Sequence, residues 1–452
     1  MLHHGDIRFF HIRTYGCQMN ELDSENMAGQ LMQRGLLPSR EEDADIIIFN
    51  TCAIRDLAER KVMGKLGQLG RLKKKKAIIG VVGCMAVTKR ERLFQKFPHV
   101  DFVLGTSNIA QLNEILDEVL LTQRKHVIHV DDTFQEEMDY AITQRDNKVV
   151  ASIVVSRGCN QFCTYCIVPY TRGKEESVPP SKIEEEARWL VEKQGYKEIV
   201  LLGQTVNGYG RDKKEWGITF ADLLYQLDKI NGLERIRFLT SHPRFFTKEL
   251  LEAMRDLPSV CEFLHLPMQS GSNAVLRKMN RGYTIEEYCE KISFAKEYVP
   301  NISFGTDVII GFPTETDEDF AKTIEIFEKV MFSVAFIFLF SPRKGTPAMR
   351  WKSSISEQEK EERFQRLLFL HVQQAAQERQ RYLGEKLEVL FEKRNKNGQL
   401  QGRSRCWKKV VAEGGEGFIS SIQSVRIHGY NHQTLLGTII DEKGRGGEVF
   451  LA

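Results

Sequence analysis

The sequence lacks a long apolar segment. No uninterrupted apolar run among its 452 residues approaches the roughly 18 residues of a membrane-spanning helix. The first residues, MLHHGDIRFF, also lack the apolar core of a signal peptide and the composition of a transit peptide. We therefore expect a cytoplasmic protein with no membrane association.

A strong excess of one charge is also lacking. The 64 Lys and Arg residues nearly balance the 61 Asp and Glu residues, which gives a formal net charge of +3. This balance excludes a protein that coats nucleic acid with a generally basic surface, so any RNA contact must be local. The basic run at residues 71–76 is one candidate for such a contact, although runs of this kind more often form a solvated loop.

Internal repeats and low-complexity segments are absent, and the chain is too long for a single core, which predicts two or three domains. Cysteine, in contrast, is present nine times. Cytosolic thiols stay reduced, so metal-binding or catalytic roles are favoured over disulfide bonds.

Three cysteines fall within eight residues, at Cys159, Cys163 and Cys166 in SRGCNQFCTYCIVPYTRG. Three thiolates can hold three irons of a 4Fe-4S cluster and leave the fourth iron open to a small molecule. The alternatives are a zinc knuckle without its fourth ligand, or three unrelated thiols. Zinc ribbons use paired Cys-x-x-Cys units, so the spacing favours the iron-sulfur cluster.

The N-terminal part, residues 1–125, alternates β-rich runs with amphipathic stretches, which predicts a small parallel α/β domain. The predicted strands are 7–14, 45–50, 77–82 and 101–104, and the predicted helices include 21–34 and 55–72. Cys17, Cys52 and Cys84 each follow one of the first three strands. Carboxyl ends of parallel strands share one edge of a sheet, so these thiols should meet there.

The three strand-end cysteines therefore predict a second metal-sulfur site, again with three ligands. The alternative is three small buried side chains, a role that cysteine often has, but equivalent positions at three strand ends favour the metal site. No such grouping includes the other three cysteines, Cys261, Cys289 and Cys406. We expect Cys261 and Cys289 to be core or half-buried thiols.

Residues 126–148 are polar and irregular, which predicts a linker, and residues 149–383 form a second α/β pattern. The predicted strands are 152–156, 198–202, 235–240, 262–266, 303–310 and 334–340, followed by a helix at 356–382. Six strand-helix units are fewer than the eight of a closed barrel, so we expect a partial (β/α)6 barrel with a wide mouth. The loop with Cys159 follows the first strand, which places its cluster at that mouth.

Polar side chains follow several of these strands, where a barrel would bind a polar cofactor and substrate. The candidates are Gln204, Asn207, Gln269, Ser270 and Asp307, and further polar residues at strand ends are Ser241, His242, Ser341 and Arg343. Such residues also serve as turns and helix caps. His242, which precedes a proline, is as consistent with a hydrogen-bonding role in a loop as with proton transfer.

The last residues, 384–452, read as short β runs separated by Gly and Asn, which predicts a small antiparallel β-barrel. Positive charge and an aromatic ring are interleaved there, at Arg403, Arg405, Trp407, Lys408 and Lys409. These residues suit a stacked base and its phosphates, and a solvated β face with one packed Trp is the alternative.

The motif at residues 159–166 resembles the signature of radical S-adenosylmethionine enzymes. With RTYGCQMN, CIVPYTRG, HLPMQSGS, MNRGYT, GFPTETDEDF and FSPRKGTPA in register, the chain resembles the methylthiotransferase family over nearly its full length. Gln18, Met19 and Asn20 match the branch that acts on isopentenyl-adenosine. Thr314 and the segment CMAV depart from the family pattern without removing a cysteine.

The resemblance implies a flavodoxin-like N-terminal domain, a radical S-adenosylmethionine barrel and an OB-like terminal TRAM module that holds RNA. It implies two 4Fe-4S clusters: a radical-generating cluster on Cys159, Cys163 and Cys166, and an auxiliary cluster on Cys17, Cys52 and Cys84 that supplies or carries sulfur. S-adenosylmethionine bound to the first cluster would give a 5′-deoxyadenosyl radical. The radical would remove hydrogen from carbon 2 of isopentenyl-adenosine at tRNA position 37, where the methylthio group is joined.

The implied partners are the tRNA anticodon stem-loop and an electron donor such as a flavodoxin or ferredoxin, and we expect a monomer. Three alternatives stay open: the same chemistry on threonylcarbamoyl-adenosine or a ribosomal protein, a two-cluster electron-transfer protein, and a non-catalytic RNA-binding protein. Electron carriers and structural sites usually complete four-cysteine ligation, which disfavours the last two.

Overall fold

The computed structural model describes residues 7–53, 56–72, 77–121, 125–131, 143–145 and 147–440. The basic residues 73–76 and most of the expected linker, 132–142, lie outside the described residues. The chain divides into two compact units, each discontinuous in sequence. The first comprises Met1–Asp146, Arg157–Glu176 and Arg343–Thr346, and the second comprises Asn147–Ser156, Ser177–Pro342 and Pro347–Ala452.

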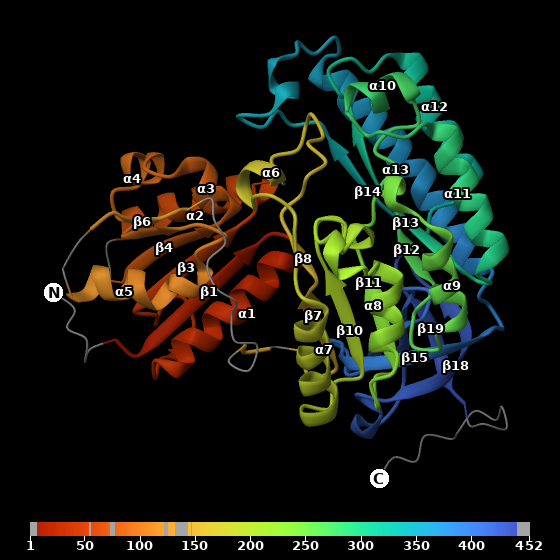
Figure 1. The fold of residues 1–452 in the computed structure, drawn as a ribbon, viewed down its shortest axis with the longest axis horizontal. Coiled ribbons are helices and arrows are strands. Elements are labelled where there is room, and N and C mark those ends of the chain that lie inside the picture. Colours follow the sequence, from red (N-terminus) through yellow and green to blue (C-terminus); the bar gives the residue numbers. More distant parts are fainter. Residues whose placement is uncertain are drawn as a thin grey trace. The chain divides into compact units, whose positions relative to one another are not determined.

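A six-stranded parallel sheet forms the centre of the first unit (Figure 1). Its strands are β1 (Phe9–Tyr15), β2 (Leu37–Pro38), β3 (Ile46–Thr51), β4 (Ile78–Gly83), β5 (Phe102–Leu104) and β6 (Val127–His129), in the order β2-β1-β3-β4-β5-β6. This order is that of flavodoxin-like folds, with the topological switch point between β1 and β3. The sequence-predicted parallel α/β domain is confirmed. Strands β2 and β6 were missed, and β6 occupies the start of the segment predicted as a linker.

Helices cover both faces of this sheet. They are α1 (Gln18–Gln33), α2 (Asp56–Leu72), α3 (Cys84–Lys89), α4 (Arg92–Lys96) and α5 (Leu112–Leu121). One core contains buried residues of α1 and α5, and the other contains residues of α2, α3 and α4. Every residue of β3 and β4 is buried, which explains their continuous apolar runs, since a parallel sheet packed on both faces has no solvent side.

Six parallel strands form the barrel of the second unit, in two three-stranded sheets. They are β7 (Val150–Val154), β10 (Glu198–Leu202), β11 (Arg235–Phe238), β12 (Phe263–His265), β13 (Ser303–Ile310) and β14 (Val334–Leu339). A single parallel bridge, from Ile236 to Val260, joins β11 to the segment before β12. The partial six-stranded barrel is thus confirmed.

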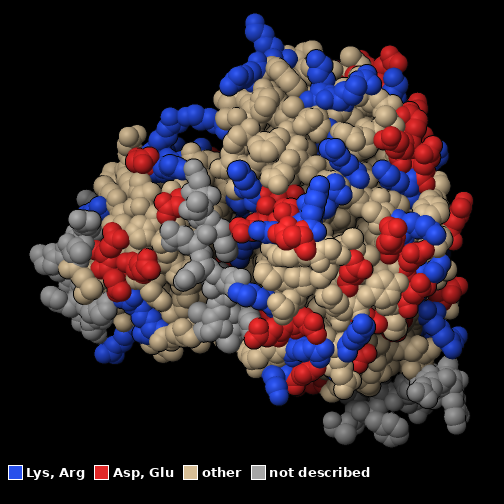
Figure 2. All heavy atoms as spheres, viewed as in Figure 1, with Lys and Arg blue, Asp and Glu red and all other residues tan. Residues whose placement is uncertain are grey.

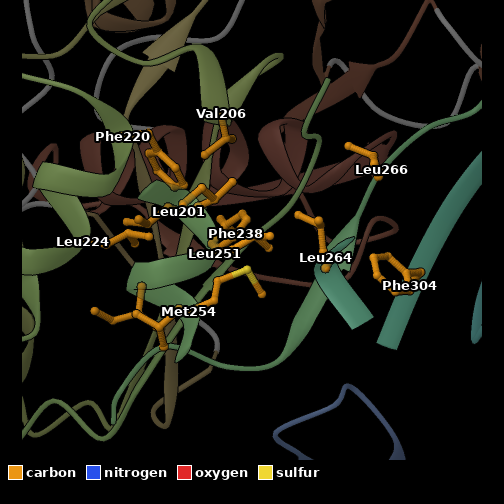
Figure 3. Packing of buried hydrophobic residues seen from close by; sticks show 14 of the residues in the cluster. Leu201, Val206, Phe220, Leu224, Phe238, Leu251, Met254, Leu264, Leu266 and Phe304 are labelled. Atoms are coloured by element: carbon orange, nitrogen blue, oxygen red, sulfur yellow. The ribbon is translucent and has the colours of Figure 1, made fainter. Parts of the chain in front are cut away.

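Helices surround these strands and bury their outer side chains. They are α7 (Pro180–Arg188), α8 (Phe220–Leu227), α9 (Lys248–Asp256), α10 (Asn273–Lys278), α11 (Ile285–Tyr298), α12 (Asp317–Val330) and α13 (Glu357–Gln380). Figure 3 shows Leu201 and Phe238 of the strands packed among Phe220 and Leu224 of α8 and Leu251 of α9. No helix in the described part of the chain has the length and apolar character needed to cross a bilayer.

A closed five-stranded barrel ends the described chain. Its strands are β15 (Lys386–Arg394), β16 (Leu400–Ser404), β17 (Lys409–Ala412), β18 (Ile422–Tyr430) and β19 (Leu435–Ile439), in the order β15-β16-β17-β19-β18. The predicted barrel is confirmed with one correction: β17 and β19 pair in parallel, and the other pairs are antiparallel. It belongs to the same compact unit as the six-stranded barrel.

Candidate functional site: two cysteine sets and a barrel mouth

Cys17, Cys52 and Cys84 directly follow β1, β3 and β4, which are neighbours in the sheet. Cys52 and Cys84 are buried, and Cys17 precedes helix α1 as its N-cap. A hydrogen bond with the Cys52 thiol and the charge of Arg172 lower the pKa of Cys17 to about 5, against the opposing effect of burial. The thiolate, which is the metal-binding form of cysteine, is therefore favoured at Cys17.

Buried amides fix the loops that carry these cysteines. Asn20 donates to Asn50 Oδ1 at 3.0 Å, Asn50 donates back to the Asn20 carbonyl at 2.8 Å, and Asn20 Oδ1 accepts from the Cys17 N–H at 3.3 Å. Gly83 precedes Cys84 with φ of +94°, and a Cβ there would lie 2.6 Å from Asn50 Oδ1. Only glycine fits this position, so Gly83 sets the backbone conformation that leads into Cys84.

The segment 157–176, which carries the other cysteine set, belongs to the first compact unit. The Cys166 N–H donates to the Cys163 carbonyl at 2.9 Å, and the Cys159 N–H donates to the Gly173 carbonyl at 3.2 Å. A short helix, α6 (Val168–Thr171), follows, and Ile167 packs with Ala53 and Cys84 in a small buried cluster. The structure therefore brings this loop next to the strand-end cysteine set.

A buried ion pair links the segment of one cysteine set to the helix that follows Cys17. Arg172, six residues after Cys166, donates from Nη2 to Asp23 Oδ2 at 3.1 Å. The Asp23 side chain is fully buried and the Arg172 side chain is 4 % exposed. Burial would lower the pKa of Arg172, but the charges of Cys84, Asp23 and Cys17 raise it above its usual value.

The donor sets fit iron-sulfur clusters. Each offers three thiols, and the strand-end set has a buried cation nearby to compensate negative charge. Within the described ranges, no three His, Cys, Asp or Glu side chains converge on a point as the ligands of one metal ion would. Ligands of a cubane bind different irons, so they need not converge in that way.

The barrel mouth carries unsatisfied polar atoms at the ends of three adjacent strands. Ser156 follows β7, Gln204 follows β10, and Ser241 and His242 follow β11. One buried side-chain atom of each has no hydrogen-bond partner within the protein: the hydroxyls of Ser156 and Ser241, Gln204 Oε1 and His242 Nε2. Such atoms are costly unless something pairs with them, so this edge is suited to a polar ligand.

The other predicted mouth residues have internal partners. Asn207 hydrogen-bonds the backbone of His242, and Ser270 Oγ accepts from the Ser272 N–H at 3.2 Å. Gln269 has a positive φ of 68°, and its backbone bonds to Asp307 and Ile309 of β13. Asp307 itself pairs with His265 at 3.3 Å. These contacts position the residues around the mouth, and ligand binding by Asn207, Gln269, Ser270 and Asp307 stays a prediction.

Three of the five predicted RNA-binding residues of the terminal barrel contact the six-stranded barrel or its helix α13. Arg405 pairs with Glu262 at 2.7 Å, and Lys408 pairs with Glu378 of α13 at 2.5 Å. Trp407 stacks on Phe263, with ring centroids 5.3 Å apart. These three side chains have partners within the chain, and RNA binding by the set of five stays a prediction.

The turn at 403–408 fills the amino-terminal end of the six-stranded barrel. Arg235 and Arg237, at the start of β11, donate to the carbonyls of Arg403, Ser404 and Arg405 at 2.6 to 2.8 Å. Arg237 also forms a buried ion pair with Glu198 at 2.9 Å. Of the predicted set, Lys409 is exposed, and Arg403 is half-buried over Trp407.

Sequence reasoning missed Asp23, Arg172 and Ser156. One signal was available for Asp23, because polar residues recur every three or four positions on the buried face of α1: Asn20, Asp23, Asn26 and Gln30. A polar stripe on a buried helix face indicates partners inside the protein. Nothing in the local sequence pairs Asp23 with Arg172, 149 residues away.

Comparisons with known proteins agree with this geometry. Residues 153–327 match the Radical SAM superfamily, and residues 9–105 match Uncharacterized protein family UPF0004. The tRNA-2-methylthio-N(6)-dimethylallyladenosine synthase of Protochlamydia amoebophila is 58% identical over 96% of both chains. The protein of that name from Thermoanaerobacter sp. is 44% identical over 96% of this chain and 93% of its own.

Among solved structures, the radical S-adenosylmethionine methyltransferase TsrM from Kitasatospora setae has a similar fold, with a TM-score of 0.55. It covers 76% of this chain and 74% of its own, at 13% sequence identity. Identity over nearly the whole length, rather than this distant likeness, decides the family. The chain belongs to the radical S-adenosylmethionine methylthiotransferases, within the family of tRNA-2-methylthio-N(6)-dimethylallyladenosine synthases.

Proposed function

We propose that this protein methylthiolates carbon 2 of N6-isopentenyladenosine at position 37 of tRNA. Two complete sets of three cysteines, in a chain 58% identical to a synthase of that name, carry the proposal. When bound, the two 4Fe-4S clusters supply the electron that cleaves S-adenosylmethionine and the sulfur that is transferred. The chain's own residues hold these groups, orient the adenine and exclude water.

Cys159, Cys163 and Cys166 would hold the cluster that binds S-adenosylmethionine, and Cys17, Cys52 and Cys84 the auxiliary cluster. The packing of Ile167 against Cys84 supports a short path between the two sets. At the mouth, the unpaired Gln204 Oε1 and the hydroxyls of Ser156 and Ser241 are suited to the amino, carboxylate or ribose groups of S-adenosylmethionine.

The interior face of β13 and β14 suits an apolar substituent on the adenine. Ala335 and Ile337 pack outward against the helical core, so alternate residues Phe336 and Phe338 face the barrel interior. Both remain partly exposed, at 45 % and 36 %. Ile309 is paired with Phe338 in the parallel register and therefore shares this face. The five-carbon dimethylallyl group would cover this surface.

The same face disfavours the threonylcarbamoyl alternative. That group carries a carboxylate, and the polar side chain next to Phe336 in register is the carboxylate of Asp307. Asp307 already has His265 as its partner, so an anionic substituent would gain no free cation from this pair and would lie against two phenyl rings. No feature of the described chain favours a ribosomal-protein substrate or a non-catalytic role.

A substrate comparison tests this assignment of the interior face. Phe336→Ala should reduce the preference for isopentenylated over unmodified anticodon stem-loop by tenfold or more in relative kcat/KM, about 1 to 3 kcal/mol. Phe369→Ala is the matched control, because Phe369 is exposed on α13 and should leave the preference unchanged. An unchanged preference in Phe336→Ala would show that the dimethylallyl group binds elsewhere.

The RNA itself needs an exposed surface, and the outer face of β18 offers one. Arg426, His428 and Tyr430 alternate there as exposed residues, and Lys386 of β15 lies opposite Arg426 in the register. Positive and aromatic side chains on a β face suit phosphates and a stacked base. Figure 2 shows that Lys and Arg are interspersed with Asp and Glu on the visible face, so the contact is local.

A reducing partner such as a flavodoxin or ferredoxin would supply electrons, and we propose a monomer that acts in the cytoplasm, where tRNA is modified. The decisive experiment is mass spectrometry of tRNA nucleosides from cells with and without the gene. Loss of methylthio-isopentenyl-adenosine on deletion is expected, and unchanged levels would refute the substrate assignment.

A further inference from the structure

Arg172 is a buried cation with a carboxylate partner. Its guanidinium donates to the Asp23 carboxylate at 3.1 Å, and Asp23 Oδ1 lies 3.6 Å from Arg157 Nη1. The segment of Arg172 also lies against the strand-end cysteine set, because Ile167 packs with Cys84, and it is tied to Cys159, whose N–H donates to the Gly173 carbonyl. Burying a cation costs several kcal/mol unless charge and hydrogen bonds compensate, and the Asp23 carboxylate supplies both.

The chain places this cation by two independent attachments. Arg172 follows α6, which contacts α3 through the cluster of Ile167, Ala53 and Cys84. The Thr171 carbonyl accepts from the Thr106 hydroxyl at 2.5 Å, which ties the same segment to the loop after β5. The Arg172 guanidinium is thus held against α1, which starts after Cys17, and Ile167 of its segment packs on Cys84, where α3 starts.

We propose that Arg172 is a positioning residue that sets the reduction potential of the auxiliary cluster, with Asp23 as its counter-charge. The inference rests on the proposed function, because it needs a cluster on Cys17, Cys52 and Cys84. A cubane with three thiolates has a net negative charge that increases by one when it is reduced. A nearby cation in a site of low dielectric constant therefore favours the reduced state.

The pair also joins the two cysteine sets, because Arg172 belongs to the segment of Cys159–Cys166 while Asp23 belongs to the helix that follows Cys17. The charge of Arg172 is buried, so solvent screens it little. The nearby cation Lys174 belongs to the same segment but is exposed, so solvent screens its charge.

The test measures the midpoint potential of the auxiliary cluster in the full chain with Cys159, Cys163 and Cys166 all changed to Ala, so that only one cluster is present. Arg172→Met should lower the midpoint potential by about 59 mV or more. This shift corresponds to a tenfold change in the one-electron reduction equilibrium. Asp23→Asn should raise it, Arg172→Lys should stay near the parent value, and Lys174→Met should leave it unchanged.

Iron content separates the possible failures. A parent variant without iron contradicts the auxiliary cluster itself, whereas normal iron with an unshifted potential in Arg172→Met overturns the role of Arg172. If Arg172→Met loses its iron, the Asp23→Asn shift decides, and an unchanged potential there overturns the proposal. If Arg172→Met and Asp23→Asn both lose iron, Arg172→Lys must keep its iron, because the positive charge is preserved. Loss of iron in Arg172→Lys also overturns the proposal.

Discussion

The side-chain amide of Asn207 holds the backbone of His242 by two hydrogen bonds. Its Oδ1 accepts from the His242 N–H at 2.8 Å, and its Nδ2 donates to the His242 carbonyl at 3.0 Å. The His242 ring is fixed separately, because Nδ1 accepts from the Arg244 N–H at 3.1 Å. In the neutral ring the proton is then on Nε2, the buried atom without a partner in the protein.

Replacing Asn207 should disturb ligand binding more than folding. Asn207→Ala leaves two backbone groups of His242 without partners, at a cost of about 1 to 3 kcal/mol. We expect several-fold weaker S-adenosylmethionine binding by equilibrium dialysis, with the chain still folded by circular dichroism. Asn207→Asp, which keeps only the acceptor, should fall between the parent and the alanine variant. Equal affinity in all three would show that this contact does not shape the ligand site.

His242 should make the apoprotein sensitive to acid. Burial, together with the charges of Arg281, Arg244 and Lys291, lowers the pKa of His242 to about 2, from 6.5 in an unfolded chain. Below pH 6.5, His242 therefore binds a proton in the unfolded state and stays neutral in the folded state. Stability present above pH 6.5 is lost as the pH falls, by up to about 1.4 kcal/mol per pH unit.

Denaturant unfolding of parent and His242→Gln between pH 7 and 5 measures this contribution. The variant should lose less stability over that range than the parent. Parallel pH profiles for the two proteins would show that His242 takes up a proton in the folded state as well.

The two cysteine sets should be separable by substitution. Anaerobic reconstitution should give about eight irons per chain, since each cubane holds four. Cys163→Ala should abolish S-adenosylmethionine cleavage, whereas Cys52→Ala should retain cleavage and form no methylthio product. Repeated turnover by Cys52→Ala would contradict the sulfur-carrying role of the auxiliary set. Cys289→Ala is the control, because this helical thiol lies outside both sets.

Two aromatic residues of the terminal barrel should behave differently. Trp407→Ala removes the ring stacked on Phe263 and should lower thermal stability, with little effect on tRNA affinity in the protein that remains folded. Tyr430→Ala, on the exposed face of β18, should weaken tRNA binding and leave stability within about 0.5 kcal/mol. Binding isotherms at two salt concentrations distinguish loss of stacking from loss of phosphate contacts. The reverse pattern would show that the 403–409 segment, rather than β18, binds the RNA.

The sequence was sufficient for features that repeat along the chain. Alternating apolar and helical periodicity predicted the parallel sheet, the six-stranded barrel and the terminal barrel, and strand-end positions brought Cys17, Cys52 and Cys84 together. It failed where a contact joins distant segments. Arg405 and Trp407 have the composition of an RNA-binding face, and only their partners Glu262 and Phe263 reveal a packed seam. Short strands such as β2 and β6 lacked the length to produce a pattern.

The interface between the 403–408 turn and the six-stranded barrel bears on how a target base would be selected. Arg235 and Arg237 anchor the 403–408 turn to the amino-terminal end of the six-stranded barrel, opposite the mouth at the carboxyl ends of its strands. Both barrels belong to one compact unit, so these hydrogen bonds give the exposed face of β18 a set position relative to the mouth. If β18 holds the RNA as proposed, this set spacing would make the distance along the folded RNA between the held segment and the base a criterion for choosing the target adenosine.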